Sequence, residues 1–311
     1  MTLLYDHPRF LEHQTGKHPE CAERLQHVTR LLDTLGLTAR CSQVDWQPLG
    51  RDKLEQVHTA NYLTTLEQLA ARGGGWADPD TVVSPASVEV AKFAAGAVCD
   101  AATRVLAGED RHALCLVRPP GHHALSDRAM GFCLLNNVAL AAQAALNQGA
   151  QRVLIVDWDV HHGNGTQAIF YDSARVGYFS IHRWPFYPGT GAAEETGTGD
   201  GRGATCNIPV EFGTSREAYL QQFTAALEEF AARIAPELVL ISAGFDSHRS
   251  DPVGSLGLEV EDFAQLTATV LAVADRYAKG RVVSVLEGGY NPPVLAECVA
   301  VHLGVMLGAE P

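Results

Sequence analysis

Two aspartates and a histidine alternate with other residues in one short segment, Asp157-Trp-Asp-Val-His. At a spacing of two residues, the side chains of Asp157, Asp159 and His161 would leave an extended segment on the same side. Carboxylate and imidazole groups are good ligands for zinc and other divalent first-row ions. Burying two neighbouring carboxylates without a cation would also cost several kcal/mol. We therefore expect Asp159 and His161 to bind a metal ion, with Asp246, after another strand, as the third ligand.

Helix capping is the ordinary structural role of an aspartate at such a place in the chain. Here the next helix is expected to begin near Gly165 or Thr166, which makes Asn164 its expected cap. Three protein ligands would leave one position on the ion open for water, as a catalytic metal site requires.

Two adjacent histidines, His122 and His123, follow a Pro-Pro-Gly turn at the end of a predicted strand. Surface histidine pairs usually carry no function, but two imidazoles beside a metal ion could serve as base and acid around an activated water. Tyr290 follows Gly288-Gly289, and its phenol could donate a hydrogen bond to a substrate carbonyl. The glycines permit close backbone approach and a movable loop.

Short apolar runs precede these residues and predict seven strands: Leu3–Tyr5, Ala113–Val117, Val153–Val156, Val176–Ile181, Cys206–Val210, Leu238–Ile241 and Val282–Leu286. Between several of them, apolar residues at helical spacing predict helices: Glu20–Leu35, Ser87–Leu106, Leu134–Leu146, Ser215–Ile234, Val260–Tyr277 and Val294–Leu307. This alternation indicates a parallel sheet covered on both faces. Five of the strands end in polar, glycine-rich clusters. Because ligands bind outside the carboxyl ends of parallel strands, one convergent site is expected.

The composition sets the class of protein. The 311 residues are 46 % apolar, which excludes intrinsic disorder, and a net charge of −13 opposes direct binding to nucleic acid or to an anionic membrane. Regular patterning continues on both sides of Gly73-Gly74-Gly75, so one domain over residues 1–311 is expected. Seven cysteines without a CxxC pair, and an N-terminus without a signal-peptide pattern, predict a cytoplasmic protein.

Taken together, five motifs resemble the histone deacetylase family, in the family's order: Arg118-Pro-Pro-Gly-His-His, Asp157-Trp-Asp-Val-His-His-Gly-Asn-Gly, Tyr187-Pro-Gly-Thr-Gly, Ala243-Gly-Phe-Asp and Glu287-Gly-Gly-Tyr. The opening Thr15-Gly-Lys-His-Pro-Glu is similar to the class II branch and its bacterial relatives. The resemblance implies a three-layer arginase/deacetylase-like α/β fold, with a single mostly parallel sheet of about eight strands flanked by helices. It also implies a zinc-dependent amidohydrolase that removes acetyl groups from the Nε-amine of lysine in proteins or peptides.

The roles that the resemblance implies fall into three groups. Around the reaction it implies the Zn²⁺ ligands Asp159, His161 and Asp246, the tandem histidines His122 and His123, their partners Asp157 and Asn164, and the oxyanion donor Tyr290. For the narrow substrate channel it implies Gly131, Phe132, Tyr187 and Gly289, with His162 near the metal floor. For a monovalent cation, K⁺, it implies Asp157 and Ser180, and for an interior cavity beside the metal it implies Arg24.

The sequence is also compatible with three other functions. An acetylpolyamine amidohydrolase would share the fold and the site. It would use an acidic gatekeeper, where this chain has Val253, or a rim such as Asp78, Asp80, Glu194 and Glu195. A ureohydrolase such as arginase would need two manganese ions and an Asp-Ala-His-x-Asp pattern, which the segment at Asp157 does not show. The third alternative is a binding or scaffold protein without catalytic activity. The oligomeric state is also open, because the helix Val294–Leu307 could pack in the core or at an interface.

Overall fold

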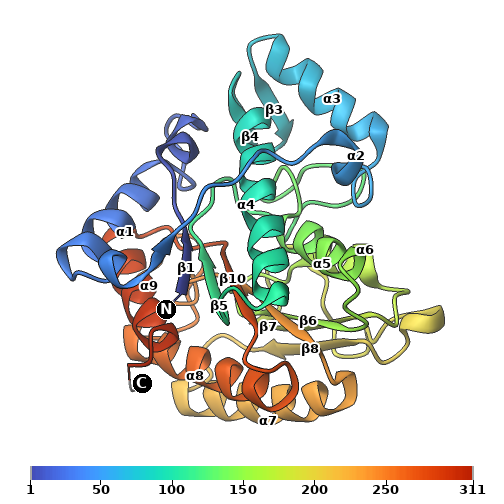
Figure 1. Cartoon of the computed structure of the whole chain (residues 1–311), viewed down its shortest axis with the longest axis vertical. Helices are drawn as coiled ribbons and strands as arrows, with labels where there is room; N and C mark the ends of the chain where they lie inside the picture. Colours follow the sequence, from blue (N-terminus) through green and yellow to red (C-terminus); the bar gives the residue numbers. More distant parts are fainter. Residues whose placement is uncertain (1, 310–311) are drawn as a thin grey trace.

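The computed structural model describes residues 2–309, and its centre is a sheet of eight parallel strands (Figure 1). Their order is β2-β1-β5-β10-β9-β6-β7-β8. The strands are β1 (Thr2–Tyr5), β2 (Ser42–Gln43), β5 (His112–Cys115), β6 (Val153–Asp157), β7 (Val176–Arg183), β8 (Thr205–Val210), β9 (Leu238–Ala243) and β10 (Val282–Leu286). Every adjacent pair is parallel, which confirms the predicted sheet.

Helices cover both faces of the sheet, so its central strands are buried on both sides. One layer consists of α4 (Ser87–Ala107), α5 (Asn137–Asn147) and α6 (Asn164–Phe170). The other consists of α1 (Glu23–Thr34), α7 (Arg216–Ile234), α8 (Val260–Tyr277) and α9 (Pro292–Met306) (Figure 1). All residues of β6, β9 and β10 are buried, as their continuous aliphatic sequences predict for a parallel sheet.

The C-terminal helix α9 packs inside this molecule. It lies between α1 and α8, and buried residues occupy most of its circumference. A helix that is apolar on all sides requires such a position, because no face of it is suited to water. The sequence had left open whether this helix packs in the core or at an interface, and the structure places it in the core.

Several short elements were not predicted. A small antiparallel hairpin, β3 (Gly75–Asp78) and β4 (Thr81–Val83), follows α2 (Arg51–Leu54) and α3 (Ala60–Ala71). The glycine run expected to be a surface loop therefore leads directly into β3. Residues 2–309 also contain three short 3₁₀ helices, Pro8–Glu12, Thr38–Arg40 and Gly199–Gly201. Elements of two to five residues bury too little apolar surface to show a clear sequence period.

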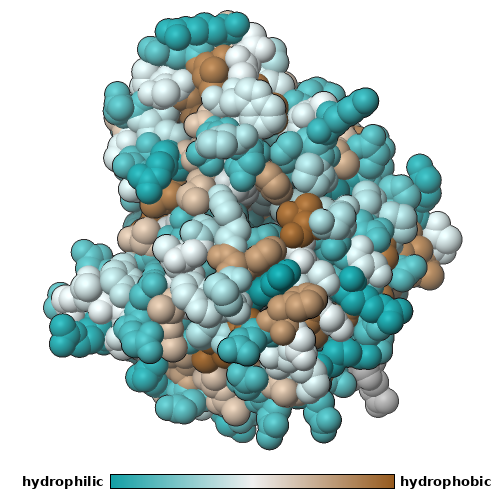
Figure 2. Space-filling view, turned by 180° about the vertical axis from the view of Figure 1, so that it is seen from behind, coloured by the Kyte–Doolittle hydropathy of each residue, from teal (hydrophilic) through white to brown (hydrophobic). Residues whose placement is uncertain are grey.

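Large hydrophobic side chains reach the surface at only a few places in the described chain: Leu35, Trp76, Tyr187 and Phe212. Seen from behind, the molecule is mostly hydrophilic, with small separated hydrophobic patches (Figure 2). Within residues 2–309, no helix is both long and apolar enough to cross a membrane. All seven cysteines are free thiols.

Candidate active site

The five strands that end in polar clusters occupy consecutive positions in the sheet. Their spatial order is β5-β10-β9-β6-β7, although the chain visits them in the order β5, β6, β7, β9, β10. Since all five are parallel, their carboxyl ends meet along one edge, where ligands bind in sheets of this type. The structure therefore brings the predicted site residues together at a single place.

Asp159, His161 and Asp246 form one buried cluster at this edge. Their potential ligand atoms lie within 4.8 Å of one another. His161 Nδ1 lies 3.0 Å from Asp159 Oδ1 and 3.1 Å from Asp246 Oδ2. No other group of three such metal-ligating side chains occurs within residues 2–309.

The donor set of this cluster fits a divalent cation. Asp246 Oδ1 accepts a hydrogen bond from the Val160 N–H at 2.9 Å, whereas its Oδ2 is buried and accepts none from the described residues. Both carboxylates lie directly against glycine backbone, because a Cβ at Gly244 or Gly288 would collide with them. Three protein ligands of nitrogen and oxygen type, with an open side, match a catalytic zinc site.

Electrostatics favour a cation at the same point. Burial, and then the nearby carboxylate of Asp159, raises the pKa of Asp246 to about 7. Two carboxylates held this close in a dry environment oppose each other's ionisation. A bound cation would pair with both and remove that cost.

Asp157 does not point to the metal cluster, contrary to the expectation that it would share one side of an extended segment. The chain bends after β6: the Asp159 N–H donates to Asp157 Oδ1 at 3.2 Å, and the His161 N–H donates to Asp159 Oδ1 at 2.9 Å. These two side-chain-to-backbone turns end the period of two. Asp157 instead accepts a hydrogen bond from His122 Nδ1 at 3.0 Å.

The second histidine of the tandem pair has a neutral partner. His123 Nδ1 donates to the side-chain oxygen of Asn164 at 2.7 Å. Asn164 is the first residue of α6 and Gly163 is the cap, so Asn164 is not the helix cap that the sequence suggested. Its side chain is therefore available to His123.

The ring centroids of His122 and His123 lie 4.1 Å apart, yet the pKa values of the two imidazoles shift in opposite directions. Burial alone would lower the pKa of His122, but the carboxylates of Asp157 and Asp159 outweigh it and raise that pKa well above its ordinary value. Burial and the charged neighbours His122 and His161 lower the pKa of His123. His122 therefore remains charged while His123 remains neutral and able to accept a proton.

Glu287 supports this turn, although the sequence only marked it as part of a motif. Its buried Oε2 accepts the N–H groups of Gly121 at 2.7 Å and His122 at 3.2 Å. Ser242 donates to its Oε1 at 3.2 Å. Burial raises the pKa of Glu287 to about 7. Only its position under the histidine turn reveals its role, because the partners are distant in the sequence.

A channel of about 220 Å³ leads to the cluster. It is lined by Asp80, His123, Gly131, Phe132, His161, Phe186, Tyr187, Val253 and Tyr290. Gly131, Phe132 and Tyr187 thus line it as predicted from the resemblance, whereas Phe186 was missed. The Phe186 ring stacks on His161 with centroids 5.2 Å apart, a contact between residues that no motif spacing connects.

Two residues that the resemblance assigns to the channel and its metal floor are not among these lining residues. His162 is buried and hydrogen-bonds Thr190 and Gln167. Gly289 has a φ of +122°, and its carbonyl accepts a hydrogen bond from Arg24 Nε at 2.6 Å. Each residue thus contacts a partner from another element, and its predicted place at the substrate channel stays a prediction.

Tyr290 reaches the channel from the glycine loop after β10. Its N–H donates to Asp251 Oδ2 at 2.6 Å, and its ring packs edge-to-face on Phe132 with centroids 5.6 Å apart. The Arg24 guanidinium lies 5.0 Å from the ring centroid. Burial raises the pKa of the phenol well above its ordinary value, so the group remains a hydrogen-bond donor.

Behind the site, Glu20 joins two fully buried arginines. Arg118 binds it in a bidentate geometry at 2.6 and 2.8 Å, and Arg24 Nη1 lies 3.1 Å from Oε1. Arg24 also donates to the carbonyls of Glu287 and Gly289. This cluster connects the N-terminal segment to the loop that carries Tyr290, and Arg24 acts through that loop.

Acid unfolding tests the Glu20 cluster. Burial alone would raise the pKa of Glu20, but Arg118 outweighs it and lowers the pKa to about 2. The stability that results from this lowered pKa is fully present above pH 4.5, the pKa of Glu20 in the unfolded chain. It is lost as the pH falls toward 2, and the free energy of unfolding then decreases by about 3 kcal/mol. We expect Glu20→Gln to lower the free energy of unfolding at pH 7 by about 3–5 kcal/mol and to remove this part of the pH dependence.

Urea unfolding at pH 7 and pH 3 measures both effects, with Glu12→Gln on the exposed surface as control. A Glu20→Gln variant that loses as much stability between the two pH values as the wild type would contradict the role of this ion pair.

The predicted K⁺ position combines a carboxylate and a hydroxyl from neighbouring strands. Asp157 and Ser180 are opposite each other in the register of β6 and β7. Ser180 Oγ lies 2.9 Å from His182 Nδ1, and Asp157 Oδ2 accepts a hydrogen bond from Tyr178 at 3.2 Å. The K⁺ site itself stays a prediction.

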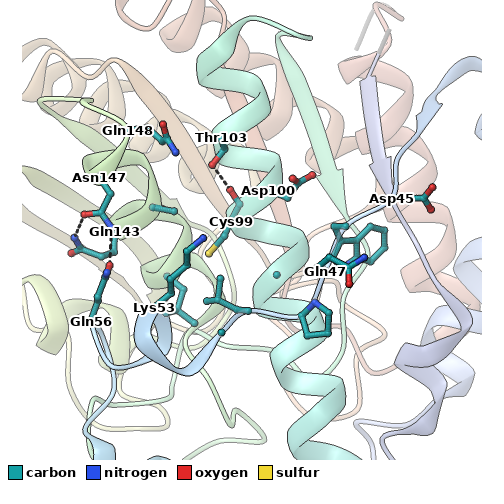
Figure 3. A pocket seen from close by; sticks show the side chains of 17 residues that line it. Asp45, Gln47, Lys53, Gln56, Cys99, Asp100, Thr103, Gln143, Asn147 and Gln148 are labelled. Carbon is teal, nitrogen blue, oxygen red and sulfur yellow. Dashed lines mark hydrogen bonds between the residues drawn. The ribbon is translucent and has the colours of Figure 1, made fainter.

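A larger cavity, of about 480 Å³, lies on the outer side of α4 and α5 (Figure 3). Residues 45–50, several carboxamides and the side chains of Lys53, Cys99 and Asp100 line it. Asn147 donates to Gln56 at 2.7 Å, and Gln143 donates to Asn147 at 3.0 Å, so these carboxamides bind one another. Within residues 2–309, the cluster of three metal-ligating side chains lies at the smaller channel and not at this cavity.

Comparison with known proteins agrees with this geometry. A family model described as "Histone deacetylase domain" matches residues 18–306. A "Probable deacetylase" of Archaeoglobus fulgidus is 40 % identical over 294 residues, which cover 94 % of this chain and 82 % of that protein. A "Histone deacetylase-like amidohydrolase" of Pseudomonas aeruginosa is 41 % identical over 283 residues, covering 90 % and 74 %.

The human "Polyamine deacetylase HDAC10" is 40 % identical over 311 residues, which cover 93 % of this chain and 45 % of that protein. Among solved structures, the HDA15 HD domain superimposes with a TM-score of 0.94 at 36 % identity, covering 99 % of this chain and 91 % of that one. Both the sequence and the spatial arrangement are thus similar to these proteins over nearly the whole chain.

Proposed function

Because this chain belongs to the histone deacetylase family, we propose that it is a zinc-dependent amidohydrolase that removes acetyl groups from the Nε-amine of lysine in proteins or peptides. The observation that carries the proposal is the meeting of the Asp159–His161–Asp246 cluster, the tandem histidines and Tyr290 around one channel. We further propose that residues 1–311 form one catalytic domain and that the protein acts in the cytoplasm.

Asp159, His161 and Asp246 would hold one zinc ion per chain. When bound, it would polarise the acyl carbonyl and lower the pKa of a water molecule. The protein supplies the rest: the buried glycine-lined cradle fixes the ligands, and the narrow channel excludes bulk water from the acyl group.

His123 is the proposed general base. It lines the channel, and its low pKa leaves it neutral and ready to accept the proton of the attacking water. Its Nδ1–H bond to Asn164 leaves Nε2 as the accepting atom. The same nitrogen then returns the proton to the leaving amine.

Tyr290 lines the channel and would donate a hydrogen bond to the negative charge that develops on the acyl oxygen. His122 stays charged through Asp157 and assists electrostatically. Donors fixed before the reaction stabilise a developing oxyanion most effectively.

A substrate panel on protein of known zinc content tests the proposal. We expect a higher kcat/KM for an acetyl-lysine peptide than for acetylspermidine, because apolar Val253 offers a second ammonium group no counter-charge. Val253→Glu should shift the ratio of the two kcat/KM values toward acetylspermidine. Val253→Gln should not, because glutamine has the size of glutamate without its charge.

A preference of the wild type for acetylspermidine would favour the alternative function, an acetylpolyamine amidohydrolase, which Asp80 at the channel and the human polyamine deacetylase relative support. Zinc-loaded protein inert toward every acyl amine would overturn both.

A further inference from the structure

One wall of the channel is a loop, residues 186–192, which we call the wall loop. At Gly191 its backbone lies directly against two buried histidines, His162 and His182. A Cβ on Gly191 would come within 2.6 Å of both His162 Cγ and His182 Nε2. Gly191 also has a φ of +95°, which favours glycine. The wall loop is therefore fitted closely to the histidines beneath it.

The carboxylate of Glu195 holds the wall loop from the other side. Its Oε1 accepts the N–H groups of Gly191 and Ala192, both at 3.1 Å. Its Oε2 accepts a hydrogen bond from Nε2 of Gln167 on α6. Glu195 thus faces inward and does not line the channel, in contrast to the acidic rim considered from the sequence. Its neighbour Glu194 is exposed.

The hydrogen bonds of this network have one direction. Since the amide nitrogen of Gln167 donates to Glu195, its oxygen must face His162 Nε2, 2.9 Å away, and that nitrogen must donate. His162 Nδ1 then accepts the hydroxyl of Thr190 at 2.8 Å. Asn207 donates to the same Gln167 oxygen at 2.7 Å. Each donor meets an acceptor, and the series ends on a carboxylate.

The network starts from the segment that carries the reacting groups. Within residues 161–167, His161 belongs to the metal cluster and Asn164 is the partner of His123. His162 and Gln167 of the same segment hold the wall loop, through Thr190 and Glu195. Tyr187, in turn, packs edge-to-face on His123 and His161, with centroids 5.3 and 6.0 Å apart. The wall and the reacting histidines are therefore fixed to the same few residues.

We propose that Glu195 is a positioning residue that holds the wall loop on α6, so that Tyr187 keeps the channel narrow around the acyl-amine chain. The substrate side of this proposal rests on the proposed function, whereas the network does not. Because Glu195 touches neither the metal cluster nor the reacting atoms, its loss should affect substrate binding and leave the chemical step and metal content intact.

Glu195→Gln is the test variant, because a carboxamide places a donor against either the Gln167 amide or the loop N–H groups. With an acetyl-lysine peptide we expect KM to rise about tenfold and kcat to change by less than about threefold. Discrimination between acetyl-lysine and longer acyl-lysines should weaken as well. The matched control, Glu194→Gln, should behave as the wild type.

Exchanging the two groups should rescue the defect. In Gln167→Glu with Glu195→Gln, the new carboxylate accepts from His162, Asn207 and the new carboxamide, whose oxygen accepts the loop N–H groups. KM and acyl selectivity should return toward wild type in this double variant. Gln167→Glu alone should not have wild-type KM and selectivity, because it places two carboxylates against each other. A purely destabilising effect of the single variant would not be reversed by a second substitution.

Amide hydrogen exchange over residues 187–196 measures the network without any substrate. We expect faster exchange in Glu195→Gln and wild-type protection in the exchanged pair. Unchanged exchange in Glu195→Gln, or faster exchange with unaltered KM and selectivity, would overturn the proposal. If the wild type hydrolysed no acyl amine, the proposed function would fall, and the exchange data would still decide whether Glu195 holds the loop.

Discussion

Replacing Asp246 with alanine is expected to abolish zinc binding and to lower kcat/KM by on the order of 10³-fold or more, since polarisation by a bound cation contributes several kcal/mol to catalysis. Asp246 is one of the three side chains of the metal cluster, and its Oδ2 lies 3.1 Å from His161 Nδ1. The change also removes the carboxylate that opposes Asp159.

Two measurements separate this effect from general damage. Elemental analysis should show zinc in the wild type and in the surface control Asp33→Ala, but not in Asp246→Ala. Added zinc should raise the Tm of the wild type, because a ligand that binds only the folded state stabilises it, and should leave the Tm of Asp246→Ala unchanged. Wild-type zinc stoichiometry in Asp246→Ala would show that the ligand set is wrong.

Tyr290→Phe is expected to lower kcat on the order of 10²–10³-fold with little change in KM, the effect of removing one oxyanion donor. Phenylalanine keeps the ring contacts with Phe132 and Arg24 and the backbone bond to Asp251. Only the hydroxyl is lost, and that group makes no hydrogen bond to any residue in the described part of the chain.

Zinc content and Tm should match the wild type in this variant, and Tyr277→Phe at the end of α8 serves as control. A Tyr290→Phe enzyme with full turnover on an acetyl-lysine peptide would remove the tyrosine from the mechanism. An equal rise in KM and fall in kcat would indicate that it mainly positions the substrate.

The strands could be predicted from local sequence because burial on both faces of the sheet requires continuous aliphatic runs. The helices could be predicted from apolar residues at helical spacing. The predicted β10, Val282–Leu286, agrees residue for residue, and α8 matches Val260–Tyr277. The strand order could not be predicted this way. Nothing in the spacing of the motifs shows that β10 lies between β5 and β9, although this placement brings the loop of Tyr290 over the metal cluster.

The groups that could do chemistry were recognisable from the sequence alone, because glycine-rich polar clusters directly after buried strands seldom have a purely structural role. The sequence assigned the two histidines, the three metal-binding candidates and the tyrosine. Their partners were decided by the tertiary structure: Glu287 under the histidine turn, and Arg118 on Glu20. Hydrogen-bond partners from distant segments leave no local period, so no spacing rule detects them.

Asp157 and Glu195 show the same division. By its spacing in the sequence, Asp157 would lie on the same side as Asp159 and His161, although the family resemblance pairs it with His122. Glu195 is a candidate for an acidic rim in the sequence. In the fold, Asp157 turns to His122, and Glu195 turns inward to Gln167. A residue's type fixes what its side chain can donate or accept. Its direction depends on which partner the packed chain presents, because a buried polar group must be paired to be stable.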